Sequence, residues 1–327
     1  MNNPTHPCFT RILDTVGHTP LIRLNRLFPE KQLKIAAKME AFNPGGSIKD
    51  RTALQLITDA MEAGKLKKGD TVVESSSGNM AIGLAQTCKY FGLNLEVVVD
   101  PMVNKQNVKI IKAYGGKVNF VNTAAKEGGY LQARLDRVQE ILRDNPRSFW
   151  TNQYGNPKNP AAHKQTMHEI VKDLGAAPDY LFAATSTCGT LMGCAEYINA
   201  NKLKTKLIAV DAVGSVIFGT PAAERKIPGH GAGRKSQFLD TKAIFDVVHV
   251  SDEECVAGCR LLMNTEAILC GGSSGAVTSA VQRYASNIPS GASIAMILCD
   301  RGERYLDTIY NEEWVKENIS TQETVLV

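Results

Sequence analysis

The sequence has 327 residues, more than a single hydrophobic core usually serves, so we expect two lobes built from one continuous chain. With 43% hydrophobic residues, 21% charged residues and a formal net charge of +4 spread along the chain, the composition argues against a nucleic-acid-binding protein. No run approaches the roughly 20 apolar residues that cross a bilayer, and the first ten residues lack an apolar signal core, so we expect a cytoplasmic protein without a membrane partner.

The eight cysteines are too sparse for a disulfide scaffold, and none forms a Cys-x-x-Cys pair. We therefore expect reduced thiols. Cys255 and Cys259 are one helical turn apart, but no histidine pair lies near them in the sequence, so ordinary helix packing explains them better than a metal site.

Short apolar runs alternate with amphipathic stretches along most of the chain. In chain order, the pattern predicts a helix at 52–63, a strand at 71–73, a helix at 80–90, a strand at 95–99, a helix at 104–114, a strand at 118–121, helices at 130–144 and 164–173, strands at 180–184, 207–210 and 247–250, helices at 253–265 and 276–284, and a strand at 294–298. This alternation is typical of βαβ units, so we expect an open α/β fold with mainly parallel sheets.

Four clusters rich in glycine, serine and threonine follow predicted strands or precede predicted helices, at 43–47, 75–79, 186–190 and 271–275. In open α/β sheets, ligands bind in the crevice outside the carboxyl ends of the strands. These clusters are therefore candidate ligand loops. The cluster at 186–190 could bind an anion at a helix N-terminus or merely cap the helix, and it lacks the spacing of a Walker loop or a dinucleotide turn.

Lys49 lies at the front of a predicted helix, where a positive charge opposes the helix dipole. One interpretation is a solvated lysine paired with Asp50. The other is a reactive amine, because burial or nearby positive charge lowers the pKa of a lysine and makes it a nucleophile toward carbonyls.

The segment Asn43-Pro44-Gly45-Gly46-Ser47-Ile48-Lys49-Asp50-Arg51 resembles the cofactor-lysine motif of the cysteine synthase and cystathionine β-synthase family. The resemblance covers nearly the whole chain, from 16–21 to 302–306. It implies the fold-type II pyridoxal-phosphate (PLP) architecture, which is tryptophan synthase β-like: two open twisted α/β domains with the cofactor in the cleft between them, usually in a homodimer. We expect 41–156 to form the smaller domain, and 1–40 with 157–327 the larger.

The resemblance also implies roles for individual residues. Lys49 would hold the cofactor as a Schiff base, then remove and return the substrate's α-proton. Asn79 would bind the cofactor's 3′-oxygen, and the hydroxyl of Ser273 would face its pyridine nitrogen. The phosphate would be held by Ser186, Thr187, Cys188, Gly189 and Thr190, and the substrate would be held by the loop Ser76, Ser77, Gly78, Asn79 and Met80 together with Gln153.

Several positions depart from ordinary cysteine synthases. Met80 stands where a threonine is usual, and Ser186 and Cys188 replace glycines in the phosphate loop. The segments 129–134, 211–219, 228–234 and 300–305 resemble one branch of the family, which serves siderophore pathways. That resemblance implies O-phospho-L-serine as donor and the amine of L-glutamate as nucleophile, which gives N-(2-amino-2-carboxyethyl)-L-glutamate, a precursor of 2,3-diaminopropionate.

Phosphoserine and glutamate are strongly anionic, so additional arginines should bind them. Arg134 and Arg234 are our candidates, because guanidinium groups bind phosphates and carboxylates bidentately. For Arg225 a surface ion pair is the better interpretation. Tyr154 is either a substrate contact or a packed core residue.

Two alternatives stay open from sequence alone. One is a cysteine synthase, using O-acetylserine or O-phosphoserine with sulfide, or a cystathionine β-synthase. The other is a non-catalytic partner protein with the same fold.

Overall fold

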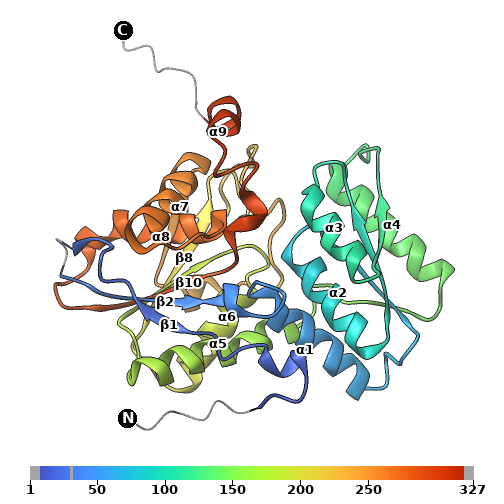
Figure 1. Ribbon diagram of the computed structural model, residues 1–327, viewed down its shortest axis with the longest axis horizontal. Coiled ribbons are helices and arrows are strands. Elements are labelled where there is room, and N and C mark those ends of the chain that lie inside the picture. Colours follow the sequence, from blue (N-terminus) through green and yellow to red (C-terminus); the bar gives the residue numbers. More distant parts are fainter. Residues whose placement is uncertain (1–7, 30–31, 320–327) are drawn as a thin grey trace.

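The computed structural model describes residues 8–29 and 32–319, which form two α/β units, each built on its own sheet (Figure 1). No helix among these residues is long and apolar enough to cross a membrane. The expected α/β class with mainly parallel sheets is confirmed.

The larger sheet has six strands in the order β1-β2-β10-β7-β8-β9. Only β1 is antiparallel to its neighbour; the other pairs are parallel. The strands are β1 (Leu21–Arg23), β2 (Lys34–Met39), β7 (Tyr180–Ala184), β8 (Lys206–Ala212), β9 (Asp246–Val250) and β10 (Ser293–Leu298).

The smaller sheet is entirely parallel, with the order β5-β4-β3-β6. Its strands are β3 (Thr71–Ser75), β4 (Asn94–Val99), β5 (Lys117–Phe120) and β6 (Ser148–Trp150). The chain enters this sheet after β2 and returns to the larger sheet at β7, so the smaller unit is an insertion in the larger one.

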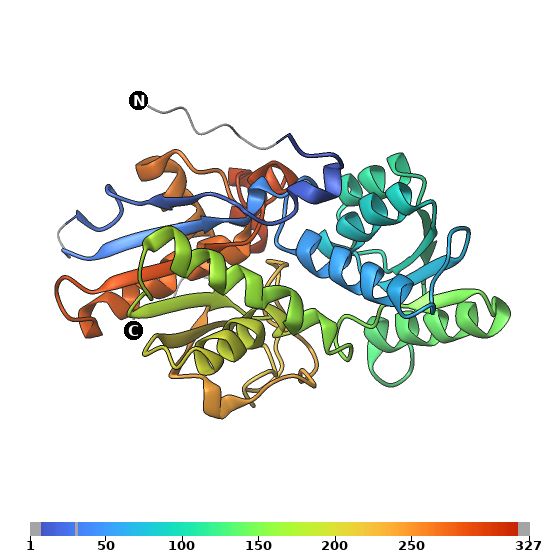
Figure 2. The same cartoon turned by 90° about the horizontal axis from the view of Figure 1, so that it is seen from below.

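Helices cover both faces of each sheet, as Figures 1 and 2 show. On the smaller sheet, α1 (Lys49–Glu62), α2 (Asn79–Phe91) and α3 (Lys105–Ala113) bury one face, and α4 (Gly129–Asp144) buries the other. On the larger sheet, α5 (Lys158–Leu174) and α6 (Gly189–Ala200) cover one face, and α7 (Asp252–Glu266) and α8 (Gly272–Tyr284) cover the other. A short helix, α9 (Glu312–Asn318), follows.

The sequence pattern missed β1, β2, β6 and α9, and of α6 it indicated only the N-terminus, at 186–190. The reason is clearest for β2, which carries Lys34 and Lys38 on one face and therefore does not read as a core strand. Lys38 is nevertheless fully buried and lies 2.9 Å from a carboxylate oxygen of Glu169. Only the opposite face of β2, with Ile35, Ala37 and Met39, is apolar and lies in the core, which is a short signal for a strand buried on both faces.

A buried cluster of charges fixes the base of α1 against the larger unit. Arg51 donates to both oxygens of Glu40, at 2.8 Å each, and to both oxygens of Glu169, at 2.7 and 2.9 Å. Glu40 also accepts hydrogen bonds from Thr19 and Asn43. Burial opposes these charges, but their partners outweigh it, so the pKa of Arg51 is raised and that of Glu169 falls to about 2.

We predict that Arg51→Met lowers the free energy of unfolding by about 3–5 kcal/mol, because it leaves buried carboxylates without their cation. Denaturant unfolding followed by circular dichroism measures this change. Arg147→Met is the matched control, since Arg147 pairs with Asp70 but has a side chain that is 71% exposed. An equal loss of stability in the two variants would contradict the prediction.

Candidate active site

One cavity gathers the residues that the sequence predicted to bind the cofactor. It is lined by Lys49, Asn79, Ser273 and the segment 186–190. These residues come from both units. Four further lining residues, Ile48, Ala184, Gly229 and Cys299, were not predicted. Cys299 directly follows β10, so its position after the carboxyl end of a predicted strand was a usable signal.

Lys49 is the first residue of α1, and its side chain lines the cavity. Burial is the main reason that its pKa is lowered from the ordinary value, while the neighbouring thiols of Cys299 and Cys188 act weakly in the opposite direction. Asp50 instead accepts a hydrogen bond from the backbone N–H of Gly45 (2.6 Å). The alternative of a solvated Lys49 paired with Asp50 is therefore not found within the described residues.

The turn before Lys49 depends on glycine. Gly46 has a φ of +85°, and a Cβ atom there would lie 2.9 Å from Arg304 Nη2. After the turn, the backbone N–H of Ile48 donates to the carbonyl of Cys299 at 2.8 Å. The motif thus joins the end of β10 to the start of α1, which places the lysine between the two sheets.

The segment 186–190 lies at the N-terminus of α6. The N-cap, Cys188, has a φ of +62° and makes no side-chain cap hydrogen bond. The first N–H group of the helix, that of Gly189, donates to Thr187 Oγ1 at 3.3 Å, so the N–H groups that follow it are the ones available to a ligand. Asn159 braces this loop by donating to Thr187 Oγ1 (3.1 Å), and Ser236 Oγ donates to the Thr187 carbonyl (2.6 Å). The loop is rigidly held, as an anion site requires.

Glu74 fixes the loop that the sequence assigned to the substrate. Its carboxylate accepts hydrogen bonds from Thr151 Oγ1 (2.5 Å) and from the backbone N–H groups of Ser75 (2.9 Å) and Gln153 (3.1 Å). Burial raises its pKa despite these bonds. Because Ser76 and Ser77 follow directly, Glu74 holds both predicted substrate segments, and nothing in the sequence analysis had identified it.

The cavity described above is not lined by Ser76, Ser77, Gly78 or Gln153. These residues are connected to lining residues through the chain or through hydrogen bonds. Asn159, for example, donates to the Gln153 carbonyl (2.6 Å) as well as to the phosphate loop. Their contacts to substrate stay a prediction.

The side chain of Met80 is 2% exposed and packs in the core of the smaller unit. Met80 does not line the cavity of Lys49, and its contact to substrate stays a prediction. The apolar periodicity of α2 explains this burial, since the helix is buried along most of its length.

The predicted substrate arginines have different surroundings. The guanidinium carbon of Arg234 lies 3.9 Å from the ring centroid of Tyr154, which is a cation–π arrangement. Arg134 Nε lies 3.4 Å from Asp100 Oδ2, beyond the carboxyl end of β4. Neither arginine lines the cavity of Lys49.

Arg225 does not form the expected surface ion pair within the described residues. It is partly buried and donates to the carbonyl of His230 at 3.1 Å, which braces the loop that carries Gly229 into the cavity.

The buried histidines contact polar side chains of neighbouring elements. His163 Nε2 lies 3.0 Å from Thr52 Oγ1, and His230 Nε2 lies 3.3 Å from Cys255 Sγ. Burial lowers the pKa of both rings, to about 4 for His230. Across residues 8–29 and 32–319, no group of three or more histidine, cysteine or acidic side chains is arranged to hold a metal ion.

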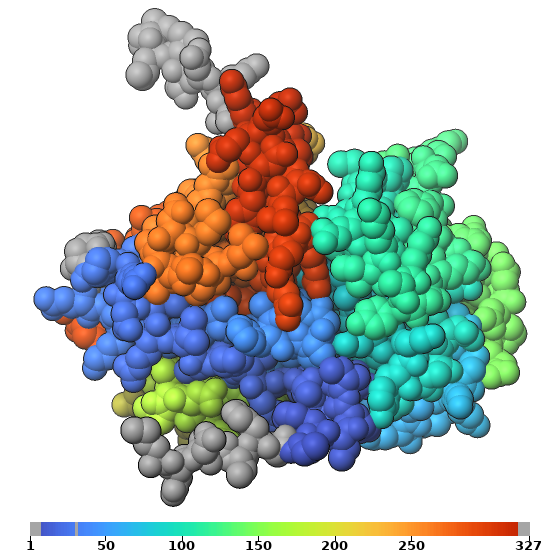
Figure 3. Space-filling model, in the orientation of Figure 1, coloured from blue at the N-terminus to red at the C-terminus, as the bar shows by residue number. Residues whose placement is uncertain are grey.

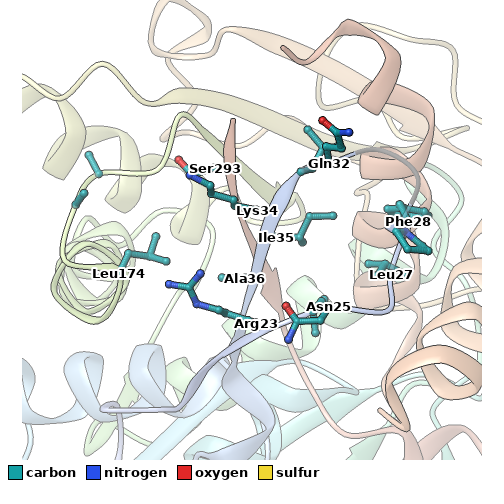
Figure 4. Close-up of a pocket in the computed structure, with 15 residues that line it drawn as sticks. Arg23, Asn25, Leu27, Phe28, Gln32, Lys34, Ile35, Ala36, Leu174 and Ser293 are labelled. Atoms are coloured by element: carbon teal, nitrogen blue, oxygen red, sulfur yellow. The ribbon is translucent and has the colours of Figure 1, made fainter. Parts of the chain in front are cut away.

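A larger pocket lies elsewhere, at the edge of the six-stranded sheet (Figure 4). The close-up shows Arg23 and Leu174 on one side of β2, and Leu27 and Phe28 on the other side. It contains none of the predicted site residues. Size alone therefore does not identify the active site.

The cavity of Lys49 offers a donor set for one particular kind of ligand. A buried amine can bond a carbonyl, the N-terminus of α6 with three nearby hydroxyl groups can hold a phosphate, and Asn79 and Ser273 can hydrogen-bond a polar ring. These residues fit the expected cofactor.

Comparisons with known proteins agree with this chemistry. A family model described as "Pyridoxal-phosphate dependent enzyme" matches residues 12–300. An N-(2-amino-2-carboxyethyl)-L-glutamate synthase of Ralstonia nicotianae is 42% identical over 305 residues, covering 93% of this chain and 90% of that protein.

Solved structures give the same picture. O-acetyl serine sulfhydrylase isoform 3 of Entamoeba histolytica has a TM-score of 0.87 at 31% identity, covering 99% of this chain and 96% of that one. The O-acetylserine dependent cystathionine beta-synthase of Helicobacter pylori has a TM-score of 0.86 at 30% identity, covering 94% of this chain and all of the other.

We predict that Glu74→Gln loosens both segments that the carboxylate holds, because an amide NH2 group would face backbone N–H donors. Hydrogen exchange at Ser75 and Gln153 should quicken, with a loss of stability of about 1–3 kcal/mol. Glu96→Gln is the control, since Glu96 lies on the adjacent strand and bonds Lys117 and Asn119 near the surface. Unchanged exchange at both amides in Glu74→Gln would refute this role.

Proposed function

The chain belongs to the family of pyridoxal-phosphate dependent enzymes, and from this premise we propose that it replaces the β-substituent of a serine-derived amino acid. The specific proposal is that O-phospho-L-serine and L-glutamate give N-(2-amino-2-carboxyethyl)-L-glutamate and phosphate. The Cβ–O bond to phosphate breaks, and a bond forms between Cβ and the nitrogen of glutamate. The 42% identity to a synthase of this name carries the proposal.

Lys49, Asn79, Ser273 and the segment 186–190 are the residues that we propose hold the cofactor. When bound, pyridoxal phosphate supplies an electron sink that lets an amino acid lose its α-proton and its β-substituent. Ser273 offers a neutral hydroxyl rather than a carboxylate to the ring nitrogen. This keeps the sink moderate, which favours elimination at Cβ over transamination.

Lys49 is the proposed acid and base. Its lowered pKa gives it a larger share of neutral amine near neutral pH, which suits attack on a carbonyl and removal of the α-proton. The same nitrogen, once protonated, can return that proton to the α-carbon after the new bond has formed. One residue then serves both proton transfers.

The loop after Glu74 is the proposed carboxylate site. Ser76, Ser77 and Gln153 would bind the α-carboxylate of the substrate, and Glu74 would keep them in place by its bonds to Ser75 and Gln153. Because the loop leads into α2, the helix N-terminus adds a favourable field for an anion.

The cation–π pair of Arg234 and Tyr154 supports the choice of anionic substrates. The guanidinium carbon lies 3.9 Å from the ring centroid, and Arg234 makes no ion pair within the described part of the chain. A contact with the ring face restricts an arginine without using its N–H donors, which leaves them for a carboxylate or phosphate. Sulfide would need no such residue.

We further propose that 41–156 acts as the smaller domain, that the enzyme is a homodimer, and that it works in the cytoplasm, where the siderophore precursor would be made. The eight cysteines are free thiols, which suits a reducing compartment.

We predict that purified enzyme, given phosphoserine or acetylserine with glutamate, sulfide or homocysteine, makes N-(2-amino-2-carboxyethyl)-L-glutamate as its main product. Mass spectrometry of the products identifies the donor and the nucleophile together. Lys49→Ala is the inactive control. Cysteine or cystathionine as the dominant product would assign the protein to the sulfur-using alternative, and no product from any pair would favour a non-catalytic protein.

We predict that Arg234→Ala and Arg134→Ala raise the KM for phosphoserine or glutamate by about tenfold or more while the cofactor stays bound. Steady-state kinetics with each substrate varied in turn measures this effect. Arg137→Ala is the control, because Arg137 lies on the same helix as Arg134 and pairs with Glu140 at the surface. An unchanged KM for both substrates would remove that arginine from the site.

A further inference from the structure

The amide of Asn79 is held between two charged side chains. Its Nδ2 donates to Asp300 Oδ2 at 2.6 Å, and Arg304 Nη1 donates to its Oδ1. A carboxylate only accepts and a guanidinium only donates, so a flipped amide would place two acceptors together on one side and two donors on the other. These partners therefore permit a single orientation of the amide.

The two charged groups are themselves fixed. Tyr305 Oη donates to Asp300 Oδ2 at 2.6 Å, and Arg304 also donates to the carbonyl of Gly45. Asp300 is 2% exposed and Arg304 is 9% exposed. At Gly271 a Cβ atom would lie 2.2 Å from Asp300 Oδ1, so the backbone closes directly over the carboxylate.

Burying two charges costs free energy unless their geometry is well satisfied. Burial raises the pKa of Asp300, although its bonds from Tyr305 and Asn79 and the charge of Arg304 counter it. A pair of apolar side chains would hold this part of the backbone at a lower cost in free energy than two buried charges. The arrangement is better explained by what it does to the amide at its centre.

Asn79 and its two partners come from different units. Asn79 begins α2 of the smaller unit, whereas Asp300 and Arg304 follow β10 of the larger unit. In the space-filling view, the red C-terminal segment borders the teal part of the smaller unit (Figure 3). Across this junction, Asn104 Nδ2 donates to the carbonyl of Arg304 at 2.8 Å. The amide is thus set by a contact across the junction of the units.

We infer that Asp300 and Arg304 are positioning residues that direct one N–H of Asn79 into the cavity of Lys49. With the oxygen turned toward Arg304 and one Nδ2 hydrogen bonded to Asp300, the second Nδ2 hydrogen is the donor that the amide has left. It therefore presents a donor, which selects an anionic or acceptor oxygen. The inference rests on the proposed function, in which Asn79 meets the oxygen on the cofactor ring.

The test is a double-mutant cycle read by the cofactor dissociation constant. Protein stripped of cofactor is titrated with pyridoxal phosphate, and binding is followed by absorbance. We expect Asn79→Ala and Arg304→Gln each to raise the dissociation constant about tenfold. The double variant should be no weaker than either single one, because Arg304 acts through Asn79.

Arg301→Gln is the matched control. Like Arg304, Arg301 donates to a backbone carbonyl near the start of the smaller unit, in this case that of Ala41 at 2.8 Å. It makes no hydrogen bond to Asn79 within the described residues. It should leave the dissociation constant within about twofold of the unaltered protein. Thermal unfolding of the cofactor-free variants shows which of them fold.

Each outcome decides a different point. If Arg304→Gln does not fold, Asp300→Asn replaces it in the cycle with the same expected non-additivity. Effects that multiply in the double variant, or an unchanged constant in Arg304→Gln beside a weakened Asn79→Ala, overturn the positioning role and leave the proposed function intact. An unchanged constant in Asn79→Ala overturns the cofactor role of Asn79 itself.

Discussion

The guanidinium of Arg51 must satisfy two buried carboxylates at once, and this requirement sets the geometry of everything that follows it in the chain. Glu40 directly follows β2 and Glu169 lies on α5, so both belong to the larger unit. A helix held by four charged hydrogen bonds at its first turn can neither rotate nor slide. Lys49, two residues earlier, is thereby placed between the sheets before any ligand is present.

The same turn of α1 reaches the cofactor loops by a neutral route. Thr52 bonds His163 on α5, and His163 lies 3.4 Å from Thr190 in the phosphate loop. One helical turn further back on α5, Asn159 bonds both Thr187 and the carbonyl of Gln153. The lysine, the phosphate loop and the substrate segment are therefore not three independent loops. They are the ends of one buried hydrogen-bond network, in which the shift of one member strains the others.

Sequence patterns predicted the fold class and the candidate ligand loops, because apolar periodicity and glycine-rich turns are local signals. The individual residues of the cavity were implied by the resemblance to a known family. They failed where the signal is non-local. Lys38 looks like a surface residue until Glu169 is placed beside it, and Glu74 looks like an exposed strand residue until four donors surround it. Which partner neutralises a buried charge is decided by topology, and spacing does not encode it.

The strand order also determines when, during synthesis of the chain, the larger sheet can finish folding. β2 is made early, yet its partner on the inner side is β10, where Ser293 pairs with Lys34. At ribosomal rates, β2 waits on the order of tens of seconds for that partner. The smaller sheet lies wholly between them in the sequence, so it can finish folding while β2 still has an unpaired edge. Newly made chains should therefore pass through a stage in which the insertion is folded but the central strand β2 is still unpaired on one edge. At that stage chaperones would be needed to keep the open edge from aggregating.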